Sequence, residues 1–159
     1  MGIVGILVSL LLPALGNAMA RAKSVACLSQ LRQIQSVLGG HGVSKLFLCP
    51  ADSERKWLVY ASRTNASYFS TSPPWEPQTI AAGDRNILLM LPDGSSCRLN
   101  GATTLFRTNV FSWGPDLHRR RGNLLLGDGS AHITTDRKLN IQVSMQPEPV
   151  FDWYIPNGP

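Results

Sequence analysis

Residues 1–40, MGIVGILVSLLLPALGNAMARAKSVACLSQLRQIQSVLGG, decide the fold of this chain. No charged side chain occurs before Arg21, and most residues from 3 to 15 are Ile, Val or Leu. A helix rises about 1.5 Å per residue, so twenty residues cover roughly the 30 Å hydrocarbon core of a bilayer. The pattern predicts a helix whose first half is a membrane anchor. The residues assigned to this anchor and to helix packing are Ile3, Val4, Ile6, Leu7, Leu10, Leu11, Leu12, Pro13 and Leu15.

After Arg21 the same helix becomes amphipathic. Apolar residues recur there at spacings of three and four, which places them on one helix face. They are Val25, Leu28, Leu31, Ile34 and Leu38. We expect one helix from near Ile3 to Leu38, bent around Pro13 because the proline ring removes a backbone donor. Its second half should dock on a folded domain.

Two other interpretations of the first segment stay open. A helix buried in a globular core is one, although the uncharged length disfavours it. A cleaved secretory signal is the other, since Ala18-Met19-Ala20 is similar to a small-residue cleavage site. That signal would lack the positive region that normally precedes its apolar run.

The composition suits one modest domain behind the helix. The chain has 159 residues, of which 43% are hydrophobic, with 14 Gly and 11 Pro. Frequent Gly and Pro favour short strands and turns over a helical bundle. We therefore expect an α+β fold: a helix over residues 1–40, a small antiparallel β-sheet domain over 43–145 and a Pro-rich tail over 146–159. The net charge of +5 permits, without requiring, binding to nucleic acid or anionic lipid.

Short runs rich in β-branched and aromatic residues predict the strands of this domain. They cover residues 45–49, 57–61, 65–70, 80–91 with a break at Gly83-Asp84, 97–99, 103–106 and 110–113. Asp93-Gly94 is a typical hairpin turn. The clearest hairpin spans residues 122–135 and turns at Gly127-Asp128-Gly129.

His118 and Asp128 are the residues that first raise a catalytic or metal-binding hypothesis. Such a site needs three or more converging ligands, or a nucleophile with a base. The chain has no H-E-x-x-H and no G-x-S-x-G motif. An Asp in a G-D-G turn usually accepts hydrogen bonds from its own loop. Three cysteines without a CxxC pair also disfavour a structural zinc site, so we assign no metal ligands.

The spacing of these residues carries a family resemblance. His118 is followed by nine residues and then by Asp128-Gly129, and this H-x9-D-G arrangement resembles the C-terminal signature of bacterial prepilin-type proteins. Other segments are similar to family motifs in the same order. They are the N-terminal helix, KLFLCPAD (45–52), NASYF (65–69), AAGDRNI (81–87) and GNLLLGDGSAH (122–132).

The resemblance implies a pilin-like fold and a structural role without catalysis, as a pseudopilin-like subunit of a type II secretion or type IV pilus-like assembly. Such a subunit sits in the bacterial inner membrane with a single span, and its C-terminal domain is periplasmic or extracellular. Its partners would be membrane lipid and other pilin-like subunits, contacted through the N-terminal helix. The family's basic leader and Phe-Thr-Leu-Ile-Glu start are absent before Gly2. Either the chain is a piece of a longer one, or prepilin peptidase does not process this member.

The helix and the first expected strand bring two cysteines into proximity. We expect Cys27 and Cys49 to be close, as a disulfide or as two buried thiols. Cys97 is expected to be a small buried hydrophobic residue. We assign Trp57, Tyr60, Tyr68 and Phe69 to the core. No cofactor is expected, although a calcium ion near Asp84 or Asp128 would match a surface loop that some secretion pseudopilins carry.

Two alternative functions remain. One is a nucleic-acid-binding minor pilin or module, in which Arg119, Arg120 and Arg121 bind phosphate and Trp113 stacks a base. Nucleic acid is the less favoured partner, because basicity of this size is common without it. The other is a secreted metal-dependent enzyme that uses His118, Asp128 and His132.

Overall fold

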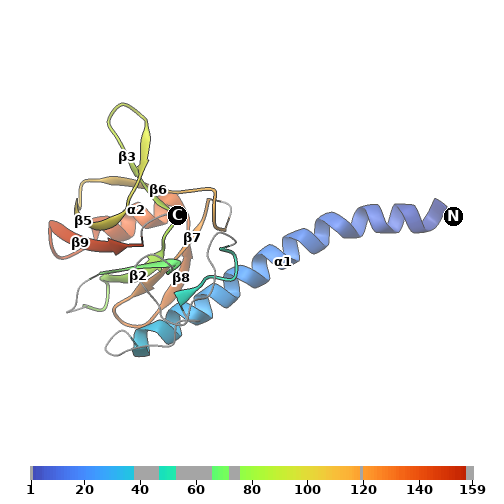
Figure 1. Ribbon diagram of the computed structural model, residues 1–159, viewed down its shortest axis with the longest axis horizontal. Coiled ribbons are helices and arrows are strands. Elements are labelled where there is room, and N and C mark those ends of the chain that lie inside the picture. The colour runs from blue at the N-terminus through green and yellow to red at the C-terminus, as the bar shows by residue number, and fades with distance from the viewer. Residues whose placement is uncertain (1, 38–46, 53–65, 72–75, 119, 157–159) are drawn as a thin grey trace.

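A computed structural model of the chain shows one long helix projecting from a small β-rich domain (Figure 1). The structure describes residues 2–37, 47–52, 66–71, 76–118 and 120–156, and within the helix it describes the side chains of residues 11–34. Helix α1 covers Gly2–Val37 without a break at Pro13 and is gently curved in Figure 1. The expectation of one continuous N-terminal helix is therefore confirmed over residues 2–37, and the bend expected at Pro13 is at most a gentle curvature.

Among the described residues, the domain consists of two antiparallel sheets and a short helix, which confirms the α+β class. Six strands form one sheet in the order β5-β9-β1-β2-β7-β8, and three form another in the order β4-β3-β6. The strands are β1 (Tyr68–Thr71), β2 (Ile80–Asp84), β3 (Ile87–Met90), β4 (Ser96–Arg98), β5 (Gly101–Phe106), β6 (Val110–Trp113), β7 (Gly122–Leu126), β8 (Ala131–Thr134) and β9 (Val150–Ile155). The chain passes from the larger sheet to the smaller one at residues 85–86, between β2 and β3.

Both turns expected from Gly-containing pairs are present. Gly94 has a φ of 82° in the turn between β3 and β4, and Gly129 has a φ of 86° in the turn between β7 and β8. Only glycine adopts such angles without steric cost. The β7–β8 hairpin pairs Asn123 with Ile133 and Leu125 with Ala131, so the expected hairpin over residues 122–135 is confirmed.

Two expectations for the domain are wrong. Residues 47–49 form no strand, since the chain bends at residue 48 and then enters a turn at Pro50. The Pro-rich tail contains β9, which pairs with both β5 and β1 inside the six-stranded sheet. The prolines were misleading because they flank the strand on both sides and none lies within it. The expected strand over 57–61, with Trp57 and Tyr60, lies outside the described residues.

Helix α2 (Asp136–Ser144) was not expected from the sequence. It buries only Leu139 and Val143, which lie one helical turn apart. Asp136 lies in the first turn, and its carboxylate accepts a hydrogen bond from the backbone N–H of Trp113 at 2.8 Å. Because most of its surface is polar, the apolar periodicity that reveals a helix is too short to detect.

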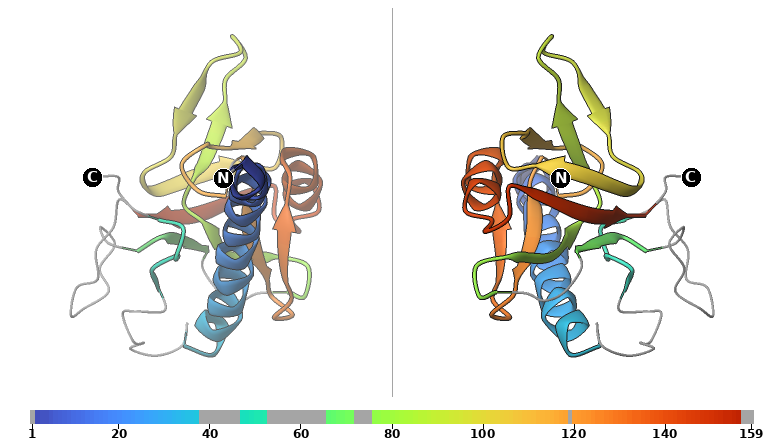
Figure 2. Two further views of the ribbon diagram at one scale, coloured as in Figure 1. Left: turned by 90° about the vertical axis from the view of Figure 1, so that its right-hand side faces the viewer. Right: turned by 90° about the vertical axis from the view of Figure 1, so that its left-hand side faces the viewer.

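The C-terminal half of α1 packs against the larger sheet, where it contacts β7 and β8 (Figure 2). Cys27, Leu31 and Ile34 are buried, whereas Val25 is 61% exposed. The predicted docking face was therefore wrong at Val25, and the buried face is rotated toward Cys27. Tyr68 strengthens this contact, since its hydroxyl donates a hydrogen bond to Gln30 Oε1 at 3.0 Å.

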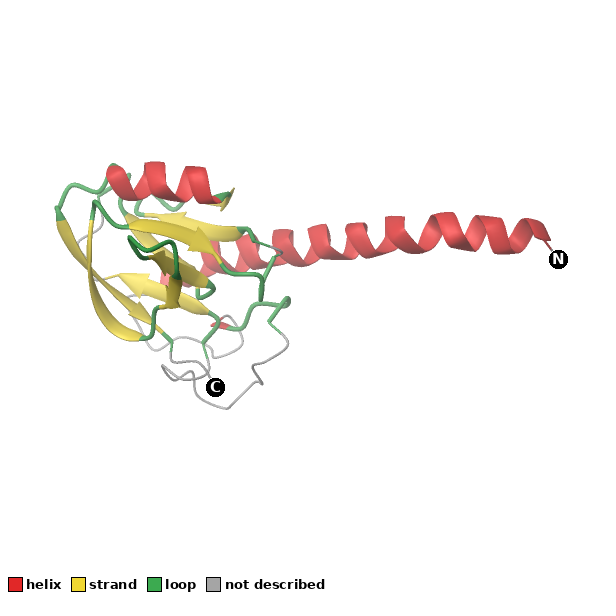
Figure 3. Cartoon of the chain, turned by 90° about the horizontal axis from the view of Figure 1, so that it is seen from above, coloured by secondary structure: helices red, strands yellow, loops and turns green. Residues whose placement is uncertain are grey.

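The N-terminal half of α1 extends away from the domain (Figure 3). Leu11 and Leu12 are 65% and 64% exposed, and Leu15 and Met19 are each 54% exposed. Over the residues that the structure describes, neither α1 nor α2 is both long and apolar enough to cross a membrane. The anchor residues from Ile3 to Leu10 lie outside the described side chains.

Aromatic side chains form the centre of the core. Trp153 of β9 stacks on Phe69 of β1 with ring centroids 4.6 Å apart, and Phe111 of β6 lies 5.2 Å from the same indole. The assignment of Tyr68 and Phe69 to the core is confirmed by their burial. Cys97 is instead a partly exposed free thiol, because β4 is an edge strand of the smaller sheet.

Candidate functional site

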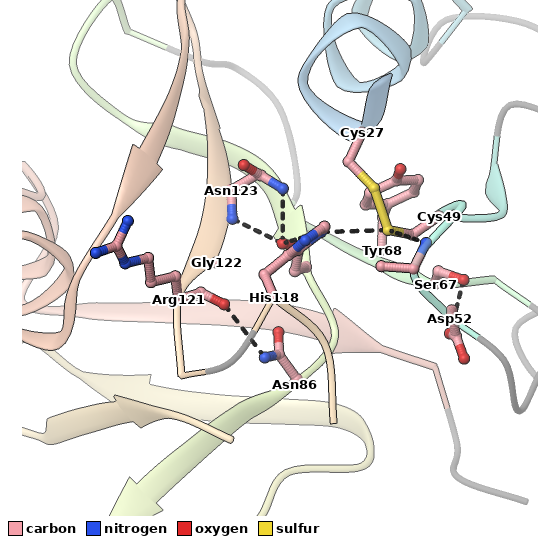
Figure 4. Close-up of polar contacts among 12 residues, drawn as sticks. Cys27, Cys49, Asp52, Ser67, Tyr68, Asn86, His118, Arg121, Gly122 and Asn123 are labelled. Atoms are coloured by element: carbon pink, nitrogen blue, oxygen red, sulfur yellow. Dashed lines mark hydrogen bonds and ion pairs between the residues drawn. A yellow bond between two sulfur atoms is a disulfide. The ribbon is translucent and has the colours of Figure 1, made fainter. Parts of the chain in front are cut away.

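The motifs that carry the family resemblance converge on one buried polar cluster (Figure 4). Its members come from α1, the segment 49–52, the residue before β1, the end of β2 and the residue after it, the loop before β7, and β7 itself. We call these residues the polar cluster: Cys27, Cys49, Asp52, Ser67, Asp84, Arg85, His118 and Asn123. Charged and polar side chains are rarely this deeply buried unless they are paired.

A disulfide joins Cys27 of α1 to Cys49. Their Cα atoms lie 5.4 Å apart, and both residues are buried. The sequence left open whether these cysteines are bonded or are two thiols; in this structure they are bonded. The link fixes the docked half of α1 to the domain covalently.

His118 lies against this disulfide. Its Nε2 is 3.3 Å from Cys49 Sγ and 3.6 Å from Asp84 Oδ2. The backbone of His118 has a φ of 37°, a conformation that non-glycine residues adopt infrequently and that is often found at functional sites. Burial lowers the pKa of the imidazole from 6.5, which favours its neutral form.

Asp84 is the most deeply buried acid of the cluster, with no exposed surface. Its Oδ2 accepts hydrogen bonds from the backbone N–H of Asn123 at 2.7 Å and from Asn123 Nδ2 at 3.0 Å. Within the described ranges its Oδ1 has no hydrogen-bond partner. Burial raises the pKa of this carboxyl to about 7, the bonds from Asn123 oppose the shift, and the charge of Asp52 adds to it.

Asp52 and Arg85 form a buried ion pair beside Asp84. Arg85 donates through Nε to Asp52 Oδ2 at 2.9 Å and through Nη2 to Oδ1 at 3.1 Å. The Ser67 hydroxyl donates to the same Oδ2 at 2.8 Å. The two side chains are 2% and 1% exposed, so water screens the pair very little. The CPAD and AAGDRN motifs are thereby held together.

Asn86 holds the loop that carries His118. Its Nδ2 donates to the carbonyl of Gly114 at 3.0 Å and to that of Arg121 at 3.4 Å. The backbone N–H of Gly114 donates in return to the Asn86 carbonyl at 2.6 Å. These bonds fix both ends of the loop, and His118 is directed inward from between them (Figure 4).

The structure does not bring His118 and Asp128 into one site. Asp128 is exposed in the β7–β8 turn, where its Oδ1 accepts a hydrogen bond from the Ser130 N–H at 2.8 Å. Bonds from Ser130 lower the pKa of Asp128. This agrees with the expectation that Asp128 serves its own loop, and Gly129 supplies the positive φ next to it. His132 is bonded within the same hairpin, to Ser130 Oγ at 3.0 Å.

The nucleic-acid hypothesis loses one of its components. Trp113 is 2% exposed and lies in the core, so it is not available to stack on a base. Arg120 and Arg121 are exposed, and Arg119 lies outside the described residues.

Sequence reasoning missed most of the polar cluster. It named Asp84 only as a place for calcium, and it assigned no role to Arg85, Asp52 or Asn123. One signal was available: Asp84-Arg85-Asn86 interrupts an apolar run that forms the buried strand β2 and the partly buried strand β3. Polar residues in such a position must be paired, but the sequence does not show with what.

The chain matches no family model, no curated protein and no solved structure. The resemblance to prepilin-type proteins therefore stays a prediction.

Replacing Asp52 tests the buried ion pair. We expect Asp52→Asn to lower the free energy of unfolding by about 3 kcal/mol, because it removes the charge that pairs with buried Arg85. Asp116→Asn is the matched control. Asp116 pairs with Arg98 at the surface, where the side chains are 23% and 36% exposed, so we expect a loss below about 1 kcal/mol. Urea unfolding of both variants measures the difference; equal losses would contradict the assignment.

The pKa of Asp84 predicts a pH dependence of stability. The folded protein keeps the Asp84 proton up to about pH 7, whereas the unfolded chain loses it near 3.8. The unfolded state therefore binds fewer protons in this window, and the Asp84 contribution to the free energy of unfolding falls as pH rises. The expected slope is on the order of 1.4 kcal/mol per pH unit.

Comparison with Asp84→Asn isolates this contribution. His118 has the opposite effect on the pH dependence. Because its pKa is lowered in the folded protein, it decreases the free energy of unfolding as pH falls below 6.5. His118 is present in both proteins, so the difference between wild type and Asp84→Asn should shrink from about pH 4.5 to about pH 6.5 in urea titrations. A difference that stays constant or grows with pH means that Asp84 is ionised in the folded protein.

Proposed function

We propose that the protein is a pilin-like structural subunit that assembles through the projecting half of α1 and has no catalytic step. The observation that carries the proposal is the division of α1 into two parts. Cys27, Leu31 and Ile34 are buried against the sheet, whereas Leu11, Leu12, Leu15 and Met19 are more than half exposed. Large exposed apolar surfaces mark sites that contact a membrane or another protein.

The anchor and the assembly contact use the same surface in this proposal. The apolar half of α1 lies in the bacterial inner membrane before assembly and packs against the helices of other subunits afterwards. The described residues alone do not make a membrane-spanning helix, so the proposal relies on the apolar sequence of residues 3–10, which precede the described side chains. Exchange of lipid contacts for helix contacts is feasible because both are apolar. The order of the family motifs supports membership in a type II secretion or type IV pilus-like assembly.

The disulfide supports a location of the domain outside the cytoplasm. Disulfides persist in oxidising compartments such as the periplasm and are rare where cytosolic reductants act. Cys27–Cys49 is buried and joins the anchor helix to the domain. A covalent joint at this place would carry any pulling force between membrane and domain.

Binding to vesicles tests the proposal. The purified full chain is mixed with vesicles of phosphatidylethanolamine and phosphatidylglycerol and floated through a density gradient. We expect the wild type to float. The vesicle-bound fraction of the double variant Leu12→Glu/Leu15→Glu should be at least about tenfold smaller than that of the wild type. Each carboxylate costs about 2.5–3.5 kcal/mol at the centre of a bilayer.

The matched control places the same charges on equally exposed apolar residues of the domain. Phe106 and Val110 are 53% and 55% exposed, and we expect Phe106→Glu/Val110→Glu to float like the wild type. Chemical crosslinking in mild detergent should give multimers of the wild type and the control, and monomers of the helix variant. Equal behaviour of both double variants, or a wild type that neither floats nor crosslinks, would refute the proposal.

A further inference from the structure

Four potential metal ligands meet in the polar cluster, although they are far apart in the sequence. They are Cys27, Cys49, Asp84 and His118, and each offers one ligand atom within 4.8 Å of the other three. Two sulfurs, one imidazole and one carboxylate make a four-ligand set of the kind that Zn²⁺ accepts. The geometry points to a zinc site in the reduced protein, formed by these four side chains.

The distances around His118 match such a site. Zinc–sulfur bonds are about 2.3 Å long and zinc–nitrogen or zinc–oxygen bonds about 2.0–2.2 Å, so the edges of a tetrahedral ligand shell measure roughly 3.4–3.8 Å. His118 Nε2 lies 3.3 Å from Cys49 Sγ and 3.6 Å from Asp84 Oδ2. In the oxidised protein the edge to Asp84 lies within this range, and the edge to Cys49 is slightly shorter than its lower end.

The bond between the two sulfurs must break before zinc can bind. In the disulfide they are bonded to each other and cannot both be metal ligands. A dithiol reductant breaks this bond by supplying two electrons and two protons, and it becomes a disulfide itself. Zn²⁺ then displaces the two thiol protons, together with the Asp84 proton wherever that carboxyl is still protonated, and binds two thiolates, the carboxylate and the imidazole. Disulfide and zinc site are therefore mutually exclusive states of the same four side chains.

Neighbouring groups are already placed to support the ligands. Asn123 donates two hydrogen bonds to Asp84 Oδ2, which orients the carboxylate. The Ala51 N–H donates to Cys49 Sγ at 3.4 Å, a contact that also stabilises a thiolate. Asp84 Oδ1, which has no partner among the residues described, is a buried acceptor that the oxidised structure leaves unused. Such outer contacts tune metal affinity by roughly 10–100-fold.

The ligand types select the metal. Calcium takes six to eight oxygen ligands, so a set with two sulfurs and an imidazole does not suit it. Thiolate with imidazole favours zinc among the common divalent ions. The inference does not depend on the proposed function, since in either redox state Cys27 ties α1 to the domain, through a bond to Cys49 or through a shared ion.

Metal binding by the full-length chain tests the inference. The chain is reduced with a phosphine, which passes two electrons to the disulfide and takes up the oxygen of water. It is then titrated with Zn²⁺ against a chromophoric chelator, while circular dichroism monitors the fold. We expect the reduced chain to bind one equivalent of zinc and the oxidised chain none. Cys97→Ser, which removes the cysteine outside the cluster, should bind like the wild type.

Variants of the ligand residues test whether the zinc ion binds at the polar cluster. We expect Cys49→Ser and His118→Ala to weaken binding at least about 100-fold, a loss larger than that for an outer contact. His118→Cys should restore it. Cobalt as a substitute should give tetrahedral absorption with a thiolate charge-transfer band, and Cys27→Ser should weaken that band even if its stability is reduced. A reduced chain that binds no zinc, or equal binding by the oxidised chain or by Cys49→Ser, would overturn the inference.

Discussion

The attachment of α1 to the six-stranded sheet is the constraint on which the rest of the structure depends. Cys27, Leu31 and Ile34 bury one face of the helix, and the bond from Cys27 to Cys49 makes this contact covalent. A crosslink between residues 22 positions apart lowers the conformational entropy of the unfolded chain, which stabilises the folded state by about 3 kcal/mol. With its C-terminal half fixed in this way, the helix can project an apolar N-terminal half without support from the domain.

The polar cluster brings sequence motifs from distant parts of the chain into contact. Asp52 follows Cys49 closely and pairs with Arg85, which brings the turn after the disulfide against the end of β2. Asp84 binds Asn123 at the start of β7, directly after the loop that carries His118. The nine residues between His118 and Asp128 contain the whole of β7. Their number therefore reflects the length of a strand and its turn, and does not define a bipartite site.

Patterns that depend on neighbouring residues were predictable from the sequence, and pairings between distant segments were not. The helix, the β7–β8 hairpin and the turn at Gly94 follow from local periodicity and glycine placement. Strand β9 was missed because its pairing with β5 and β1 and the packing of Trp153 on Phe69 involve distant residues, while the flanking prolines suggested a tail. The buried ion pair and the His118–Asp84 contact join residues at least 33 positions apart, which no local signal reveals.

Hydrogen exchange along α1 tests the division of the helix most directly. In the monomeric full chain without lipid, we expect the amides of residues 27–34 to exchange as slowly as those of the core strand β7. Amides of residues 11–19 should exchange faster by at least about tenfold, because no tertiary contact protects them. Equal protection of both segments would show that the apolar half packs into its own domain, and would contradict the account.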